Sequence, residues 1–294
     1  METPPVCSYE NSDYQASFWE QGGRAYEDAS EAVALRRLLP PGGGKLMLEL
    51  GAGAGRNTPR YAQYQRVVLL DYSHTQLEQA RQRMGDSERF TYVAADIYHL
   101  PFASGLFDGA TMIRTLHHMA DARRALDQVR QALQPGAAFI LEFANKQNFK
   151  SILRYALRRQ SWSPFSPEPI EFAPLNFDFH PATVRSWLNL AGFAVERQLT
   201  VSHFRVGWMK RFIPLGLLVG MDSLAQLSGG WWQLSPSVFV RNRAVGETAL
   251  APEGAFFRCP VCASPLADTP PAITCPACGK TYPVEGGLYD FRLN

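Results

Sequence analysis

The sequence has almost no excess charge and no long apolar run. Its 29 lysines and arginines face 27 aspartates and glutamates, so the formal net charge is +2. That balance lacks the strong basic excess of a dedicated nucleic-acid-binding protein, although it leaves room for a local basic patch. No stretch reaches the roughly 18 uncharged apolar residues of a membrane-spanning helix, so we expect no transmembrane segment.

The sequence also has few cysteines outside one cluster. Four of its five cysteines gather near the C-terminus in metal-ligand spacing, and Cys7 stands alone. This usage favours a reducing compartment over a disulfide framework. The first residues, Met1 to Pro5, have neither a basic run nor an apolar core, so we expect no secretory signal peptide. Together these features predict a cytoplasmic protein, and 294 residues suffice for a large domain with a small appendage.

The most informative stretch, residues 46–71, reads as strand, glycine loop, helix and strand. The apolar run at 46–50 ends in the loop Gly51-Ala52-Gly53-Ala54-Gly55, and the run at 66–70 ends on Asp71. Between them Thr58, followed by a proline, predicts a helix N-cap. A glycine loop lets a ligand lie against bare backbone, and an acid about 20 residues later can bind two ribose hydroxyls. The stretch predicts a nucleoside-binding half-fold.

The loop differs from the nicotinamide fingerprint G-x-G-x-x-G. It reads G-x-G-x-G, one residue shorter, and Glu49 precedes it. A carboxylate at this point would repel a pyrophosphate but could pair with the ammonium group of an amino-acid-bearing cofactor. Residues 48–55 resemble motif I of the class I S-adenosylmethionine (SAM) methyltransferases. The alternative, a tight turn without a ligand, is disfavoured by the acid that ends the second strand at the right distance.

The resemblance continues in order to about residue 145. Ser73 to Gln76 has the form of a capping box, and Asp121 is a second predicted N-cap. Ala95-Asp96-Ile97 and Leu116-His117-His118 are similar to further motifs of the family. We expect strands at 46–50, 66–70, 89–94, 108–113, 137–143, 194–204 and 237–243. Strands alternating with helices predict an α/β fold with a doubly wound, mostly parallel, seven-stranded sheet of Rossmann-like type.

The resemblance implies particular roles around SAM. Asp71 would bind the ribose, Asp96 the adenine amino group, and Glu49 would lie near the ammonium group. The implied cofactor-binding residues are Glu49, Gly51, Ala52, Gly53, Gly55, Asp71, Tyr72, Asp96, Ile97 and Arg114. His117 is the candidate general base, required only for a poor nucleophile, and a structural histidine is the alternative. Three aromatic residues ahead of the first strand either cover the cofactor or pack the sheet: Tyr14, Trp19 and Tyr26.

Two segments, 146–180 and 205–235, are additions to the minimal domain expected of this family. The first contains a basic amphipathic stretch at 150–159 and an aromatic cluster at 176–180, which we place on the substrate side, with a structural excursion that covers the sheet's edge as the alternative. The second contains an apolar segment at 212–232. Core packing or a homo-oligomer face is the favoured explanation there, with a lid or an interfacial membrane contact as alternatives. The predicted organisation is a covering segment at 1–40, a methyltransferase domain at 41–245 and a zinc ribbon at 255–294.

The C-terminal cysteines form two C-x-x-C pairs, Cys259 with Cys262 and Cys275 with Cys278. Four thiolates suit a tetrahedral, structural Zn²⁺ with no open position for water, and so short a module needs a metal to supply its folding free energy. Residues 278–287 resemble the zinc-ribbon family of methyltransferase-activator subunits. That resemblance implies a built-in stabiliser or a substrate-recognition module. We favour the stabiliser because the module is not conspicuously basic.

The sequence therefore predicts a SAM-dependent methyltransferase acting on a small, apolar or aromatic acceptor, resembling the ubiquinone and menaquinone biosynthesis type. One alternative is a methyltransferase of RNA or of a translation factor, suggested by the ribbon and by the basic stretch at 150–159. Another is a non-catalytic SAM-binding scaffold. The acceptor atom cannot be read from the sequence.

Overall fold

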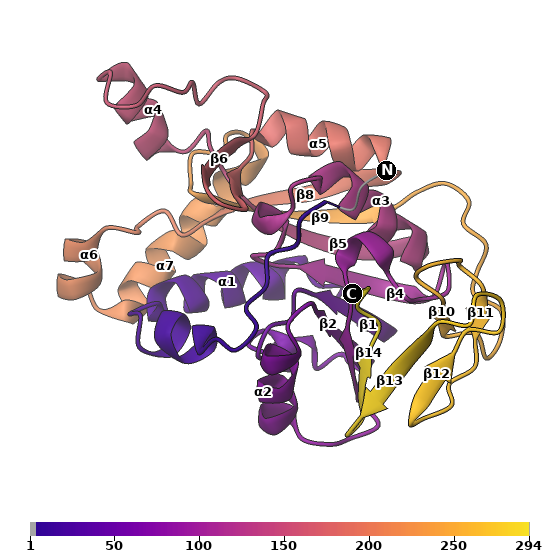
Figure 1. Ribbon diagram of the computed structural model, residues 1–294. Coiled ribbons are helices and arrows are strands. Elements are labelled where there is room, and N and C mark those ends of the chain that lie inside the picture. Colours follow the sequence, from indigo (N-terminus) through magenta and orange to yellow (C-terminus); the bar gives the residue numbers. More distant parts are fainter. Residues whose placement is uncertain (1–3, 294) are drawn as a thin grey trace.

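A ten-stranded mixed sheet runs through the protein, whose residues 4–293 are described by the computed structural model (Figure 1). The strand order is β12-β13-β14-β3-β2-β1-β4-β5-β9-β8. The five strands from β3 to β5 are parallel, and β9 is antiparallel to both β5 and β8. The α/β prediction is confirmed, and the run from β3 to β8 contains the seven strands expected for the methyltransferase.

The seven strands lie close to their predicted positions. They are β1 (Gly44–Leu50), β2 (Tyr64–Asp71), β3 (Phe90–Ala94), β4 (Phe107–Met112), β5 (Leu133–Ala144), β8 (Phe193–Val201) and β9 (Ser237–Ala244). The main helices are α1 (Ala25–Leu38), α2 (His74–Met84), α3 (Ala122–Ala132) and α5 (Pro181–Leu190). The inserts contribute α4 (Phe149–Ala156), the hairpin β6 (Ile170–Ala173) and β7 (Asn176–Asp178), α6 (Gly207–Phe212) and α7 (Leu215–Ala225). Among the described residues no helix is both long and apolar enough to cross a membrane.

Each face of the sheet has its own hydrophobic core because side chains alternate along a strand. On β1, Leu48 packs into the cluster under α3, α5 and the C-terminal module. Its neighbour Met47 packs into the cluster with α1 and α2 on the opposite face. The central strands are buried on both faces, so their sequences read as continuous apolar runs rather than as alternating ones.

Strand register brings the predicted site residues to one edge. Leu50 pairs with Leu70 of β2 and with Met112 of β4, so these three strands end level with one another. Asp71 pairs with Ala94 at the end of β3. The loops that follow all four strands therefore meet at the carboxyl edge of the sheet, where open α/β folds bind ligands.

Two predicted helix N-caps are confirmed and a third is wrong. Ser73 Oγ accepts a hydrogen bond from Gln76 N (3.2 Å), and the Asp121 carboxylate accepts one from Arg124 N (3.0 Å). Thr58 caps no helix. It begins the short 3-10 helix η2 (Thr58–Tyr61), and its hydroxyl donates to Glu49 Oε2 (2.6 Å). The Thr58 hydroxyl is thus bonded to the buried Glu49 carboxylate and does not cap a helix.

The C-terminal module extends the main sheet. Its strands are β10 (Phe257–Arg258), β11 (Pro265–Leu266), β12 (Ala272–Thr274), β13 (Thr281–Glu285) and β14 (Leu288–Asp290). β14 pairs in parallel with β3, and the next residue, Phe291, donates its N–H to Ala94 O (2.8 Å). Phe257 and Phe291 are buried in the same core cluster as Phe102. The module thus lengthens the sheet from seven strands to ten.

The apolar segment at 212–232 is not explained by core packing. Leu218 is buried, but Phe212, Leu224 and Trp231 are 73%, 73% and 84% exposed. The helix α7 is held on α1 by polar contacts instead, among them Tyr26 Oη donating to Asp222 Oδ1 (3.0 Å). The favoured core explanation is therefore wrong for most apolar side chains of this segment.

Candidate active site and metal centre

A pocket opens at the carboxyl edge of β1, β2 and β4, beneath the N-terminal segment. Seven of the ten predicted cofactor-binding residues line it: Gly51, Ala52, Gly53, Asp71, Tyr72, Ile97 and Arg114. Tyr14 and Trp19 of the predicted covering segment also line it. Tyr26 does not, because its ring is buried and its hydroxyl is bonded to Asp222 between α1 and α7.

The glycine loop has the backbone geometry that the sequence predicts. Gly51 and Gly53 have φ values of +66° and +53°, the left-handed region that glycine occupies without strain. A Cβ at Gly51 would also lie 2.0 Å from Thr115 Oγ1. The loop therefore needs glycine at this point both for its conformation and for the close approach of the loop after β4.

Asp71 holds the loop and faces the pocket. Its Oδ2 accepts a hydrogen bond from Gly53 N (2.8 Å), and its Oδ1 accepts one from Ser73 N (2.9 Å). Burial raises the pKa of this carboxyl, and the backbone hydrogen bonds offset part of that rise. Each oxygen has a second lone pair, so the carboxylate can still accept from the two ribose hydroxyls.

Trp19 contacts two arginines at the same pocket. The Arg56 guanidinium is 3.6 Å and that of Arg114 is 5.1 Å from the Trp19 ring centroid. Both arginines pair with the buried Glu31, at 2.8 Å and 2.5 Å. Burial raises the pKa of Glu31, but the charges of Arg114 and Arg56 outweigh it and hold the pKa at about 2. Cation–π contacts between Trp19 and these two arginines, which Glu31 holds in place, therefore attach the covering segment to the pocket wall.

Three predicted cofactor residues do not reach the pocket wall: Glu49, Gly55 and Asp96. Glu49 is 3% exposed and turns toward Thr58, and burial raises its pKa to about 7. The Asp96 carboxylate caps the next turn by accepting from Tyr98 N (2.9 Å), and its other oxygen lies 2.9 Å from His99 Nδ1. Both carboxylates have local partners that the family motif does not specify.

Of the two adjacent histidines, His118 lines the pocket and His117 does not. His118 Nδ1 lies 3.0 Å from Leu175 O, so it must donate, and Nε2 then accepts from the Tyr9 hydroxyl (3.1 Å). Burial lowers the pKa of His118, in keeping with this neutral form. His117 Nδ1 is buried without a hydrogen-bond partner among residues 4–293. Burial lowers its pKa well below the usual range.

Several wall residues were missed by the sequence reasoning, among them Tyr9, Arg56, Asn57, Gln76, Thr115 and Met119. Arg56 and Asn57 directly follow the glycine loop, so their position along the chain could have identified them. Gln76 sits in the first turn of α2, where its side chain donates to Ser12 O (3.0 Å). No local sequence pattern pointed to Tyr9, because its position depends on how the N-terminal segment packs over the folded sheet.

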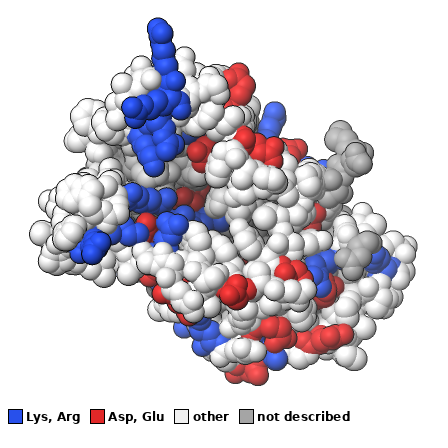
Figure 2. Space-filling model, turned by 60° about the vertical axis from the view of Figure 1, so that its left-hand side comes forward, with Lys and Arg blue, Asp and Glu red and all other residues white. Residues whose placement is uncertain are grey.

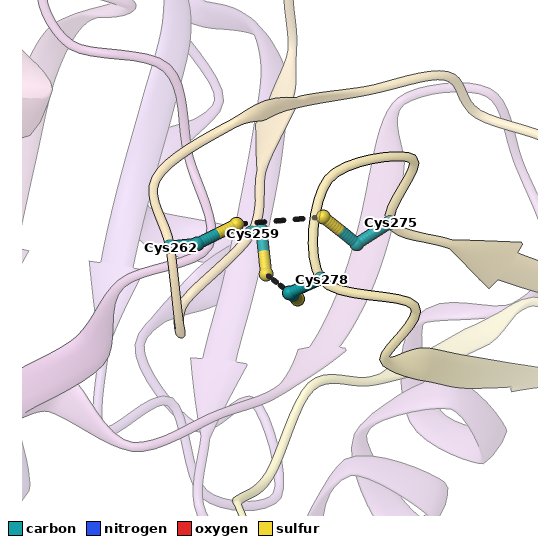
Figure 3. Close-up of side chains that lie close together, drawn as sticks. All are labelled: Cys259, Cys262, Cys275 and Cys278. Atoms are coloured by element: carbon teal, nitrogen blue, oxygen red, sulfur yellow. Dashed lines mark hydrogen bonds between the residues drawn. The ribbon is translucent and has the colours of Figure 1, made fainter.

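The four cysteines converge from two loops of the C-terminal module (Figure 3). Their sulfur atoms all lie within 4.8 Å of one another. Cys259 and Cys278 are separated by 3.6 Å, and Cys262 and Cys275 by 3.5 Å. Zinc about 2.3 Å from each sulfur would set these separations at roughly 3.8 Å, so the arrangement fits a tetrahedral ion. Tyr282 Oη lies 3.1 Å from Cys259 Sγ and can donate to that thiolate.

Comparison with known proteins agrees with this geometry. Residues 48–141 match the family model described as a methyltransferase domain. A demethylmenaquinone methyltransferase of Clavibacter sepedonicus is 29% identical over 178 residues, 55% of this chain and 71% of that protein. The O-methyltransferase cnsE of Penicillium expansum is 32% identical over 135 residues, 42% of this chain and 48% of that protein. The match thus spans about half the length of the second relative.

Solved structures share the fold at low identity. A chain from the complex between the Haloferax volcanii Trm112 methyltransferase activator and its candidate methyltransferase superposes with a TM-score of 0.56 and 17% identity. The superposition covers 79% of this chain and 96% of that one. Residues 48–141 thus match a methyltransferase domain, and this match, the relatives and the motif I loop support a class I SAM-dependent methyltransferase whose C-terminal four-cysteine cluster fits a zinc ribbon.

Proposed function

We propose that the chain transfers the methyl group of SAM to a small, apolar or aromatic acceptor, and that the acceptor is a quinol or a related phenol. The relatives support this class by name, since one acts on a demethylmenaquinone and the other is an O-methyltransferase. The acceptor attacks the methyl carbon as the carbon–sulfur bond breaks, which leaves S-adenosylhomocysteine and a proton to be removed. Holding the two reactants in line can supply much of the rate enhancement.

The observation that best supports the proposal is that two segments of the chain cover the site. The N-terminal segment and the β6–β7 hairpin both reach the carboxyl edge of the sheet and meet at His118. Tyr9 bonds one imidazole nitrogen, and Leu175, between β6 and β7, bonds the other. An acceptor has to fit beneath these two segments, which favours a small molecule over a folded RNA or a protein surface.

The ribbon supports the same conclusion because its arginines are already bonded within the chain. Arg258 Nη2 donates to Gln131 Oε1 (2.7 Å) on α3. Arg292 pairs with Asp290 (2.6 Å) and with Glu10 (3.1 Å). Arg292 is thus engaged by two carboxylates, and Arg258 by a neutral amide, within the chain. We therefore propose that the module holds a structural zinc ion through Cys259, Cys262, Cys275 and Cys278, and that it stabilises the methyltransferase.

Two groups are proposed to accept the proton from a phenolic acceptor. His117 is neutral at pH 7, since its pKa lies well below the usual range, but for the same reason it is a weak base. Asp178, on the hairpin, has a pKa raised to about 6 by burial and by the charge of Glu142. A carboxylate with that pKa is ionised at neutral pH and is a stronger base than an ordinary aspartate. Asp178 ends β7, which packs against the turn Leu116–His118, so we add it to the candidate His117.

The test is a transfer assay with methyl-labelled SAM. Quinols and phenols, total RNA, and protein extract are offered separately, and label is counted in each fraction. Label in a quinol or phenol supports the proposal. Label confined to RNA or protein would overturn it, as would SAM binding with no transfer to any fraction.

The base is assigned with the acceptor identified in that assay. If Asp178 is the base, kcat rises with pH to a plateau above about 6, and Asp178→Asn removes that rise. His117→Gln would then leave the profile unchanged. A profile that loses its rise only in the His117 variant would transfer the role to His117.

A further inference from the structure

Exposed apolar side chains are concentrated in one part of the molecule. Twenty large apolar residues are exposed in the described part of the chain, and fifteen of them belong to two segments, four in 149–157 and eleven in 206–234. Such side chains are ordinarily scattered over a soluble surface, and their concentration marks an interaction site. The two segments are the inserts that contain α4 and α6–α7.

The first segment alternates apolar and basic positions in the pattern of an interfacial helix. Phe149 and Leu153, four residues apart on α4, are 63% and 48% exposed. Lys150 and Arg154 follow each of them by one position, and Leu157, Arg158 and Arg159 continue the pattern just past the helix. The only fully buried residue of α4 is Ser151, so both its apolar and its basic side chains face outward.

The second segment repeats this combination. Trp208 and Phe212 on α6 are 61% and 73% exposed, and the exposed Arg211 directly precedes Phe212. Lys210 is instead paired with Glu27 of α1 (3.0 Å), so Arg211 is the basic residue that α6 offers to a partner. On α7, Leu217 and Leu224 are 59% and 73% exposed. Aromatic rings beside lysine and arginine are the side chains that settle at the boundary between lipid headgroups and acyl chains.

Neither segment presents a carboxylate to solvent. Residues 146–163 contain no aspartate or glutamate. Residues 203–235 contain one, Asp222, which is 0% exposed and accepts hydrogen bonds from Tyr26 and His203. The charge of both segments is therefore of one sign, and it is complementary to an anionic surface.

Both segments project from the same side of the molecule. In Figure 1, α4 and α6 extend to the left, away from the zinc ribbon. Figure 2 brings that side forward and shows mostly uncharged lobes at the top and left that carry basic atoms, with a hollow between them. A flat partner could touch both lobes at once.

We propose that α4 and the α6–α7 segment dock this protein onto the surface of an anionic phospholipid bilayer. RNA would satisfy the basic residues but would leave Leu217 and Leu224 against sugar and phosphate. A second copy of the chain, paired by two-fold symmetry on this face, would bring the same basic residues together without compensating carboxylates. A bilayer accepts the apolar side chains and the basic ones together. The inference does not depend on which acceptor is methylated.

The test is co-sedimentation of the full chain with vesicles at low salt. One set is phosphatidylcholine alone, and the other contains about 30% phosphatidylglycerol, with binding expected to be at least about tenfold stronger to the second and weaker in high salt. Two variants should each lose most of that binding: Trp208→Ser with Phe212→Ser, and Lys150→Gln with Arg154→Gln and Arg158→Gln.

Matched control variants are Leu250→Ser and Arg123→Gln, which replace exposed residues outside both segments and should bind vesicles like the parent chain. Circular dichroism and SAM affinity, unchanged in every variant, exclude unfolding as the cause of lost binding. Equal binding to both vesicle types, no binding to either, or variants that bind like the parent chain would overturn the proposal. So would retention on RNA without retention on vesicles, or a monomer–dimer equilibrium that only the segment variants abolish.

Discussion

The two additions to this methyltransferase, the zinc ribbon at one edge of the sheet and the α4 and α6–α7 inserts near the other, use similar side chains in opposite ways. In the ribbon, aromatic residues such as Phe257 and Phe291 are buried in the main core, and Arg258 and Arg292 are bonded within the chain. In the inserts, aromatic rings are exposed. The side chains of Lys150 and Arg154 have no hydrogen bond or ion pair within residues 4–293.

On our two proposals, this difference separates a stabilising module from an interaction surface. A basic or aromatic residue indicates a partner only where the fold has left it without one. By that criterion the ribbon, the part that looks like a recognition module in sequence, is committed to the fold. The exposed aromatic and basic side chains of the inserts remain available to a partner.

The ribbon also connects to the cofactor pocket. Arg292, two residues past β14, pairs with Glu10 of the covering segment (3.1 Å) and lies 5.9 Å from the ring of Tyr72 on the pocket wall. Glu10 in turn accepts from His74 N and Thr75 N (both 2.9 Å) at the start of α2. A change in the ribbon can therefore reach the SAM site through one ion pair.

The largest expected effect follows from removing a zinc ligand. Cys275→Ser should abolish zinc binding and lower Tm by roughly 10 °C or more, because on our proposal the module would lose the metal that folds it, and its strands carry part of the main core. Zinc content per chain and thermal unfolding measure this. The matched variant Cys7→Ser lies outside the cluster and should keep its zinc. Full zinc content or an unchanged Tm in the Cys275 variant would contradict the stabilising role.

The next effect concerns Asp71. Asp71→Ala removes the carboxylate that orders the glycine loop and that we propose binds the ribose, so SAM affinity should fall at least about 100-fold, near 2.7 kcal/mol. Isothermal titration calorimetry measures it. Asp86→Ala is the control, since Asp86 is 82% exposed near the other end of α2. Equal SAM affinity in the Asp71 variant and the parent chain would refute the assignment.

A smaller effect tests the link from ribbon to pocket. Arg292→Gln should lower the free energy of unfolding by about 1–3 kcal/mol, since it removes charged hydrogen bonds that are partly buried. SAM affinity should fall several-fold as the covering segment loosens. Lys280→Gln, in the same module, is the control and should change neither quantity. Lost stability with full SAM affinity would mean that the ion pair serves the fold alone.

A separate effect, spread over several pH units, is the pH dependence of stability due to Glu49. Its pKa is raised from 4.5 to about 7 in the folded protein, so the folded state holds this proton more tightly than the unfolded state does. Its contribution to stability is fully present below about pH 4.5 and is lost as pH rises through about 7, on the order of 3 kcal/mol in all. Glu49→Gln should flatten that part of the stability profile and still accept from Thr58. A parent chain and a variant with parallel profiles would show that Glu49 does not titrate there.

Much of the cofactor half could be predicted because its signals are local. The glycine loop, the acid that ends β2 and the caps at Ser73 and Asp121 depend on residues within a few positions of one another. The side-chain partners of Glu49 and Asp96 were not predicted, because a motif gives the residue type and the neighbouring turn decides which donor the carboxylate meets.

Sequence alone determined the α/β class, the SAM loop and the four-cysteine cluster, since each is a short pattern with one physical solution. Only the tertiary structure decided three further features. Trp19 contacts Arg56 and Arg114, β14 joins β3, and most apolar side chains of α6 and α7 remain exposed. Each depends on contacts between segments far apart in the chain, and no local pattern specifies which surface a folded neighbour will cover and which it will leave free.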